Sequence, residues 1–190
     1  SQQSDNPEGG GSTISFSNEF ESQVVGGAVP TEFIPACEKG FLDGCLRGPL
    51  TGHPMVGVKM VLNDGSAHVV DSNEHAFRTA ASQAFRQACL QAAPIILEPI
   101  MRVTITVPTE FQGAIMGTIN RRMGVIVDTE GQDEVAVIQA DVPLNSMFGY
   151  STELRSLTQG KGEFSMEYRT HQPVPGNIQA ELVAAHQKSK

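Results

Sequence analysis

Hydrophobic and polar residues alternate just before a short polar segment in the first half of the chain. Val56, Val58 and Met60 recur at every second position, which is the spacing of a half-buried strand. The polar segment 63–68 follows, and its Asp-Gly pair at 64–65 predicts a turn in which glycine accepts a positive φ. Because this segment has no large apolar side chain to bury, we expect it to project into solvent.

An amphipathic helix is predicted directly after the polar segment. Asp71 and Glu74 have the spacing of a capping box, which places the start of the helix at about residue 72. Pro94 marks its end. The apolar positions that share one helical face are Phe77, Ala81, Ala84, Phe85, Ala88 and Cys89. Segment 56–93 is therefore a strand and a helix joined by an exposed, histidine-bearing tip.

The remaining patterns divide the chain into two halves. The first half adds a strand at 14–20, a helix at 31–46 and a short strand near residue 95. After the prolines of 94–99, the second half has strands at 101–107, 125–127, 135–142 and 164–168, helices at 108–123 and 145–158, and a turn at 130–133. Its order is β-α-β-β-α-β, the ferredoxin-like split arrangement.

We therefore predict an α+β protein built from two small α/β-sandwich domains. The first domain covers residues 1–97, the second covers residues 98–172, and a C-terminal helix and tail cover residues 173–190. Two domains of roughly 90 to 100 residues each lie within the usual size range.

The chain has 190 residues and a net charge of −8, and both halves are acidic. Residues 1–97 hold 5 basic and 10 acidic side chains, and residues 98–190 hold 8 and 11. Wide contact with a nucleic-acid backbone depends on lysine and arginine at the phosphates, so this charge balance argues against it. Any contact with RNA must be local and depend on shape.

The sequence predicts neither a membrane-spanning segment nor a metal-binding set of cysteines. No apolar run approaches the roughly 20 residues that span a bilayer, so no membrane partner is expected. The cysteines have no metal-binding spacing and fit buried free thiols in a reducing compartment. They are Cys37, Cys45 and Cys89.

His68 is the first candidate functional residue, because it lies in the projecting segment. A neutral imidazole is flat and both donates and accepts hydrogen bonds, which suits stacking or bonding in a nucleic-acid minor groove. The alternative is an exposed loop histidine without a special task. No Ser-His-Asp or Cys-His arrangement is present, so no catalytic residue is predicted. His53 and His75 lack metal-ligand spacing, so no metal site is predicted.

Arg121 and Arg122 are the second candidates, at the end of a predicted helix. They either complement the helix dipole in solvent or contact an RNA phosphate. The Gly-Lys-Gly segment at 160–162 lacks the other residues of a phosphate loop, and we interpret it as a helix end that enters a strand.

Five motifs, in order along the chain, resemble the last two domains of translation elongation factor G. They are VGGAVP at 25–30, DGSAHVVDS at 64–72, LEPIM at 97–101, NRRMG at 120–124 and MFGYSTELRS at 147–156. The resemblance covers residues 14–173. The variants FLDGC at 41–45, DSNE at 71–74 and STE at 151–153 look like the mitochondrial translocation form.

The resemblance implies a ribosome-contacting module with no enzyme activity or cofactor of its own. The family is a ribosomal GTPase, so GTP and magnesium are expected in N-terminal domains that act in cis. The fourth domain has a left-handed β-α-β crossover of the ribosomal-protein-like kind, and its tip follows the transfer-RNA and messenger-RNA complex into the decoding region. The matching tip residues are Asp64, Gly65, Ser66, Ala67 and His68. The fifth, ferredoxin-like domain faces large-subunit RNA, and its basic motif matches Arg121 and Arg122.

The expected role is translocation during protein elongation, by a monomer in the mitochondrial matrix. A bacterial cytoplasm or another organelle is the alternative location. The alternative functions are the related mitochondrial ribosome-recycling factor and a stand-alone RNA-binding module. The family carries a second, glycine-rich tip loop before the fourth domain's first strand. We expect that loop and that strand to be missing here, which would leave a strand edge exposed.

Overall fold

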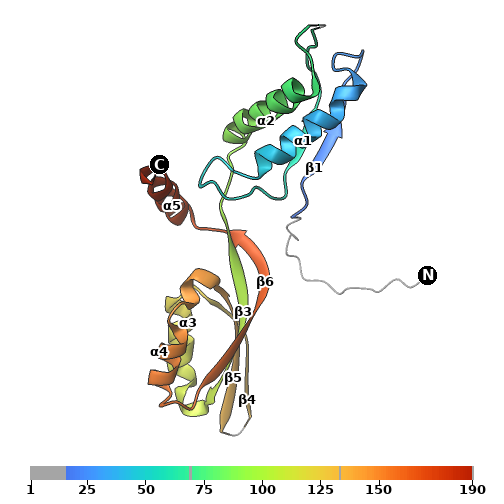
Figure 1. Cartoon of the computed structure of the whole chain (residues 1–190). Coiled ribbons are helices and arrows are strands. Elements are labelled where there is room, and N and C mark those ends of the chain that lie inside the picture. Colours follow the sequence, from blue (N-terminus) through green and yellow to red (C-terminus); the bar gives the residue numbers. More distant parts are fainter. Residues whose placement is uncertain (1–15, 69, 133, 190) are drawn as a thin grey trace, which may run out of the picture. The chain divides into compact units, whose positions relative to one another are not determined.

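The computed structural model describes residues 16–68, 70–132 and 134–189 of the chain (Figure 1). Contacts within the chain define two compact units, Ser1–Pro94 with Asn177–Lys190 and Ile95–Gly176. The described residues form two sheets covered by helices, which confirms a mixed α/β fold class. No helix in the described ranges combines the length and the apolar character needed to cross a membrane.

The first unit joins two short parallel strands to two long helices. Its elements are β1 (Glu19–Ser22), η1 (Thr31–Phe33), α1 (Ile34–Cys45), β2 (Lys59–Leu62), α2 (Glu74–Gln91) and the C-terminal α5 (Gly176–Lys188). Phe20 of β1 is paired with Met60 of β2, and α1 forms the crossover between the two strands. Helices α1 and α2 lie side by side (Figure 1).

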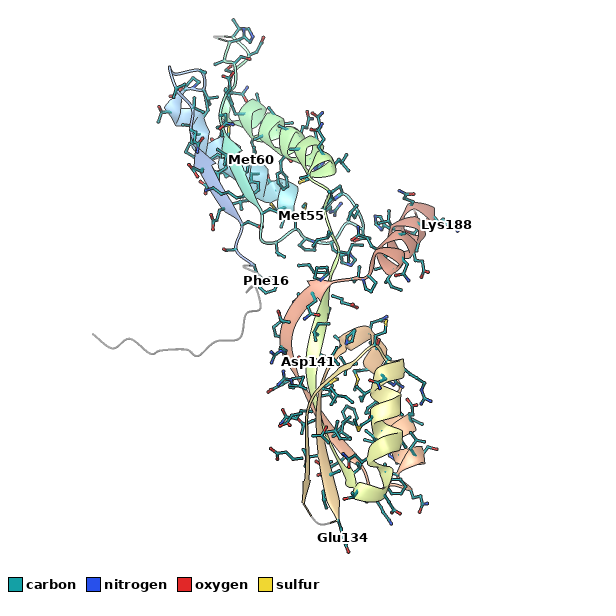
Figure 2. All side chains as sticks on the ribbon, turned by 180° about the vertical axis from the view of Figure 1, so that it is seen from behind. Phe16, Met55, Met60, Glu134, Asp141 and Lys188 are labelled. Carbon is teal, nitrogen blue, oxygen red and sulfur yellow. The ribbon has the colours of Figure 1, made fainter. Side chains whose placement is uncertain are left out.

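The core of the first unit lies between these helices and the sheet. Its buried members are Phe41, Cys45, Phe85 and Cys89. Met55 and Met60 pack against them (Figure 2). The rings of Phe41 and Phe85 meet edge to face at 4.9 Å between centroids. All three cysteines are buried and free, as predicted, and burial raises the pKa of the Cys45 thiol to about 11.

The second unit is a four-stranded antiparallel sheet with two helices over one face (Figure 1). Its elements are β3 (Leu97–Pro108), η2 (Thr109–Phe111), α3 (Gln112–Arg121), β4 (Val125–Gln132), β5 (Val135–Pro143), η3 (Leu144–Met147), α4 (Tyr150–Leu157) and β6 (Glu163–Pro173). The strand order β4-β5-β3-β6 and the antiparallel pairing are those of the predicted β-α-β-β-α-β arrangement.

Alternation along the strands separates the two faces of this sheet. Inward positions such as Val103, Ile105 and Ile138 are fully buried beneath α3 and α4. On the strands' other face, Arg102 donates to Asp141 at 2.6 Å, and Asp141 also pairs with Arg169 at 3.2 Å. Asp141 is labelled on its strand in Figure 2. The buried face therefore holds the helices, whereas the open face carries this cluster of charged side chains.

Several predicted boundaries were wrong. Helix α2 begins at Glu74, because Asn73 is the cap, and the Asn73 Oδ1 accepts the Ala76 N–H at 2.9 Å. Strand β2 occupies only the end of the predicted segment 56–62, and β4 continues through most of the predicted turn at 130–133. Residue 133 lies outside the described residues, as does the start of the strand predicted at 14–20.

Candidate nucleic-acid interface

The tip loop, residues 64–68, lies in the connection between β2 and α2 at one end of the first unit (Figure 1). Because β1 and β2 are parallel neighbours, the loops that follow them leave the same edge of the sheet. Pairing continues to the base of both loops, where the Gln23 N–H donates to the Leu62 carbonyl at 2.8 Å. All of segment 63–68 is exposed, which confirms the exposure predicted for it.

The backbone of His68 is fixed, whereas its imidazole is exposed. The His68 N–H donates to the Ser72 Oγ at 2.7 Å, and the Ser72 N–H donates to the His68 carbonyl at 3.0 Å. Among the described residues, none forms a hydrogen bond with the His68 imidazole. The side chain therefore keeps both ring nitrogens for a partner, and its backbone anchor limits the directions in which it can point.

Glycine is required at position 65 because the backbone there passes close to a neighbouring side chain. The positive φ predicted for Gly65 was wrong. The left-handed φ values near the tip belong instead to Gly26 and Gly27, in the loop after β1, at 66° and 69°. A Cβ on Gly65 would lie 2.5 Å from the Val29 Cγ2. Val29 itself is only 3% exposed. The tip loop thus rests on a buried valine of the neighbouring loop.

Two valines near the tip were not identified from the sequence. Val25, in the loop after β1, is 80% exposed, and Val70, just beyond the tip loop, is 90% exposed. Large apolar side chains at this exposure suit contact with a partner surface. A signal was present in the sequence, since both valines stand in the motifs that carry the family resemblance.

The side chain of Arg122 is hydrogen-bonded to partners within the second unit. Its Nη2 and Nε donate to the Glu153 Oε2 at 2.6 and 3.0 Å, and its Nη1 donates to the carbonyls of Ser146 and Phe148. Its guanidinium also lies over the Tyr150 ring, 5.0 Å from the centroid. With its side chain 19% exposed, Arg122 ties the end of α3 to α4 and to the loop that precedes it.

Arg121 differs from its neighbour in exposure. Its side chain is 70% exposed and makes one ion pair, from Nη2 to the Glu153 Oε1 at 3.0 Å. Hydrogen bonds from Arg122 are the main reason that the pKa of the Glu153 carboxyl lies below its usual value. Arg121 is therefore the member of the pair with donors available to a phosphate.

The predicted sites fall in both units, with the tip loop in the first and the arginine pair in the second. Within the described part of the chain, no three histidine, cysteine or acidic side chains are grouped to hold a metal ion. Segment 160–162 connects α4 to β6, and the Gly162 N–H donates to the Thr158 Oγ1 at 2.9 Å. No helix follows it, so its geometry does not fit a phosphate loop.

The fold and the exposed tip are those of a translation-factor module, and comparison with known proteins identifies the family. The model of "Elongation factor G, domain IV" matches residues 8–93, and that of "Elongation factor G C-terminus" matches residues 95–182. The chain belongs to the elongation factor G family, and the resemblance in its motifs is thereby confirmed.

Individual relatives agree with this assignment. The chain is 54% identical over 172 residues to elongation factor G-1, mitochondrial, of Arabidopsis thaliana, which covers 90% of this chain and 23% of the relative. A crystal structure of a protein from Thermus thermophilus matches with a TM-score of 0.81 and 32% identity, over 92% of this chain and 26% of that one. The chain thus spans about a quarter of the length of these relatives.

Proposed function

We propose that this chain is the ribosome-contacting module of a translational GTPase that promotes translocation of tRNA and mRNA. The tip loop enters the decoding region, and GTP hydrolysis occurs in domains outside these residues, where GTP and magnesium are bound. The proposal rests chiefly on the geometry of His68, whose imidazole is exposed while Ser72 holds its backbone. That geometry occurs in a segment that matches domain IV of elongation factor G.

In this role the tip acts by position and shape. An exposed imidazole can stack or hydrogen-bond in the minor groove of a short RNA duplex. Once the tRNA and mRNA have moved, the tip loop would occupy the space behind them and oppose their return. The close approach of Gly65 to the buried Val29 supports this idea, because it gives the loop a packed base.

In the second unit, Arg121 is the residue that we assign to large-subunit RNA. Its exposure leaves most of its donors free for phosphate oxygens. Arg122 supports that contact indirectly, by fixing the end of α3 against α4. The partners are thus the RNA of both ribosomal subunits and the tRNA–mRNA complex, and the protein acts as a monomer.

We assign the protein to the mitochondrial matrix, on the strength of its identity with a mitochondrial elongation factor G-1 of a plant. Buried, free cysteines are compatible with that compartment.

The direct experiment replaces the corresponding segment of an active elongation factor G with these 190 residues. We expect the chimaera to support single-turnover translocation, measured by movement of fluorescent tRNA on mitochondrial ribosomes. A chimaera that binds ribosomes and hydrolyses GTP without moving tRNA would contradict the proposal. If it instead accelerates subunit splitting with a recycling factor, the recycling function is the correct one.

A further inference from the structure

Two of the three cysteines lie at one end of the first unit's core. Cys45 is the last residue of α1, and Cys89 lies in the last turn of α2. Both belong to the buried cluster that also contains Phe41 and Phe85, and they are only 3% and 6% exposed. The proposed function gives neither thiol a role.

The packing of the two helices brings the ends that carry these cysteines together. A Cβ on Gly40 would lie 3.1 Å from the Ala81 Cβ, and a Cβ on Gly44 would lie 2.6 Å from the Phe85 ring. A step of four residues along α1 is thus matched by a step of four along α2, so the helices run in the same direction and end on the same side. The Cβ atoms of a disulfide are about 3.5–4.5 Å apart, so helices that approach this closely can be bridged by one.

Met55 contacts both cysteines. Its N–H donates to the Cys45 carbonyl at 2.7 Å, and the Cys89 Sγ donates to its Sδ at 3.7 Å. Met55 is labelled in Figure 2. The pKa of the Cys45 thiol is raised to about 11, chiefly by burial and also by the Cys89 thiol, which agrees with two thiols in one small cluster.

We propose that Cys45 and Cys89 form a redox-sensitive pair, which hydrogen peroxide joins into a disulfide. The Cys89 thiol loses its proton to water, and the thiolate attacks one peroxide oxygen. The O–O bond breaks, which leaves a sulfenic acid and a hydroxide that takes up the released proton. The Cys45 thiolate then attacks the Cys89 sulfur, so that the S–S bond forms and the sulfenic oxygen leaves as water. The two thiols together lose two electrons, and the peroxide is reduced to two waters.

The position of the pair at the helix ends explains how buried thiols react. Only a thiolate attacks peroxide, and burial raises the pKa of both thiols, so the closed core reacts slowly. Helix ends fray, and local opening of the last turns exposes the pair while the rest of the unit stays folded. Cys37 lies about 12 Å from Cys45 along α1, so it is outside the pair.

The disulfide would join the ends of α1 and α2 that lie away from the tip loop. It would also close a segment that contains β2 and the tip loop, which restricts the unfolded chain. Oxidation would therefore stabilise the first unit and leave the exposed imidazole of His68 as it is.

The test treats the folded 190-residue chain with hydrogen peroxide, blocks the remaining thiols with N-ethylmaleimide, and maps disulfides by mass spectrometry of proteolytic peptides. We expect the Cys45 and Cys89 peptides to be joined, Cys37 to be blocked, and dithiothreitol to reverse the reaction. Amide hydrogen exchange of α1 and α2 should slow by at least about tenfold in the oxidised chain. Cys37→Ala is the matched control and should form the same disulfide, whereas Cys45→Ala should show no slowing on oxidation.

Four results of the mapping would overturn the inference. They are unreacted thiols, a disulfide that includes Cys37 or joins two chains, sulfinic acid without a disulfide, and a Cys45–Cys89 disulfide that forms only in chains unfolded by urea. Because the mapping uses the unaltered chain, the result does not depend on whether a cysteine variant folds.

Discussion

Gly40 of α1 lies directly against the backbone carbonyl of Arg78 in α2. A Cβ on Gly40 would come within 2.1 Å of the Arg78 oxygen, a distance at which the two helices would have to separate. One turn along, a Cβ on Gly44 would come within 2.6 Å of the Phe85 ring. These glycines therefore set how closely α1 and α2 approach each other.

Gly40→Ala should therefore destabilise the first unit by about 3 kcal/mol, because the contact is with backbone and cannot be relieved by a rotamer change. Amide hydrogen exchange of α1 and α2 should show the loss. The control is Gly113→Ala in α3, where a Cβ would meet nothing within 4 Å. That change should stabilise its helix by up to about 1 kcal/mol. Equal effects of the two substitutions would contradict the packing argument.

The support of the tip loop by Val29 can be tested with a double-mutant cycle. Gly65→Ala should cost about 1–3 kcal/mol through overlap with the Val29 side chain. Val29→Ala creates space at the same point, so the double variant should lose less free energy of unfolding than the sum of the single variants. Hydrogen exchange of residues 64–72 measures this coupling. Strictly additive changes in free energy would show that the two side chains are not in contact.

Arg121 and Arg122 should behave in opposite ways when each is replaced by alanine. Arg122→Ala removes the hydrogen bonds to Glu153, Ser146 and Phe148 and should lower the free energy of unfolding by about 2–3 kcal/mol. Arg121→Ala removes one exposed ion pair and should cost less than about 1 kcal/mol. Both tyrosines of the chain lie in the second unit, so tyrosine fluorescence in urea reports on this unit alone.

The same ion pair predicts a dependence on pH. Arg122 lowers the pKa of Glu153 in the folded state, so the carboxylate stabilises the fold above its ordinary pKa near 4.5. That contribution is lost as the pH falls through the lower, folded-state pKa. Tyrosine-detected urea midpoints measured from pH 7 to about pH 3 should therefore decline more steeply in the unaltered chain than in Glu153→Gln. Parallel curves would show that Glu153 contributes nothing to acid sensitivity.

Helical periodicity in the sequence predicted the existence of α2 and part of its buried face. On the predicted apolar face of α2, Ala81, Phe85 and Cys89 are buried and Phe77 is half-buried, whereas the prediction was wrong for Ala84 and Ala88, which are exposed. The cap of that helix could not be predicted, because Asp71, Ser72 and Asn73 are all good caps. In the fold Ser72 is used by the His68 N–H, and Asn73 becomes the cap.

The features that the sequence did not predict depend on contacts between distant segments of the chain. The need for glycine at position 65 comes from Val29, which belongs to another loop. Arg122 was interpreted as either a solvated charge or an RNA ligand, because its partners Glu153 and Ser146 belong to elements far along the chain.

The central claim is that the exposed imidazole of His68 acts by contact with the moving tRNA–mRNA complex. The most direct test is single-turnover translocation by the full-length protein that carries these residues, compared with its His68→Ala variant. His53→Ala is the matched control in the same unit, where the imidazole is bonded to the Thr51 hydroxyl at 2.8 Å. The account predicts translocation about tenfold slower for His68→Ala, equivalent to about 1.4 kcal/mol, with unchanged GTP hydrolysis. An unchanged translocation rate, with ribosome binding intact, would contradict it.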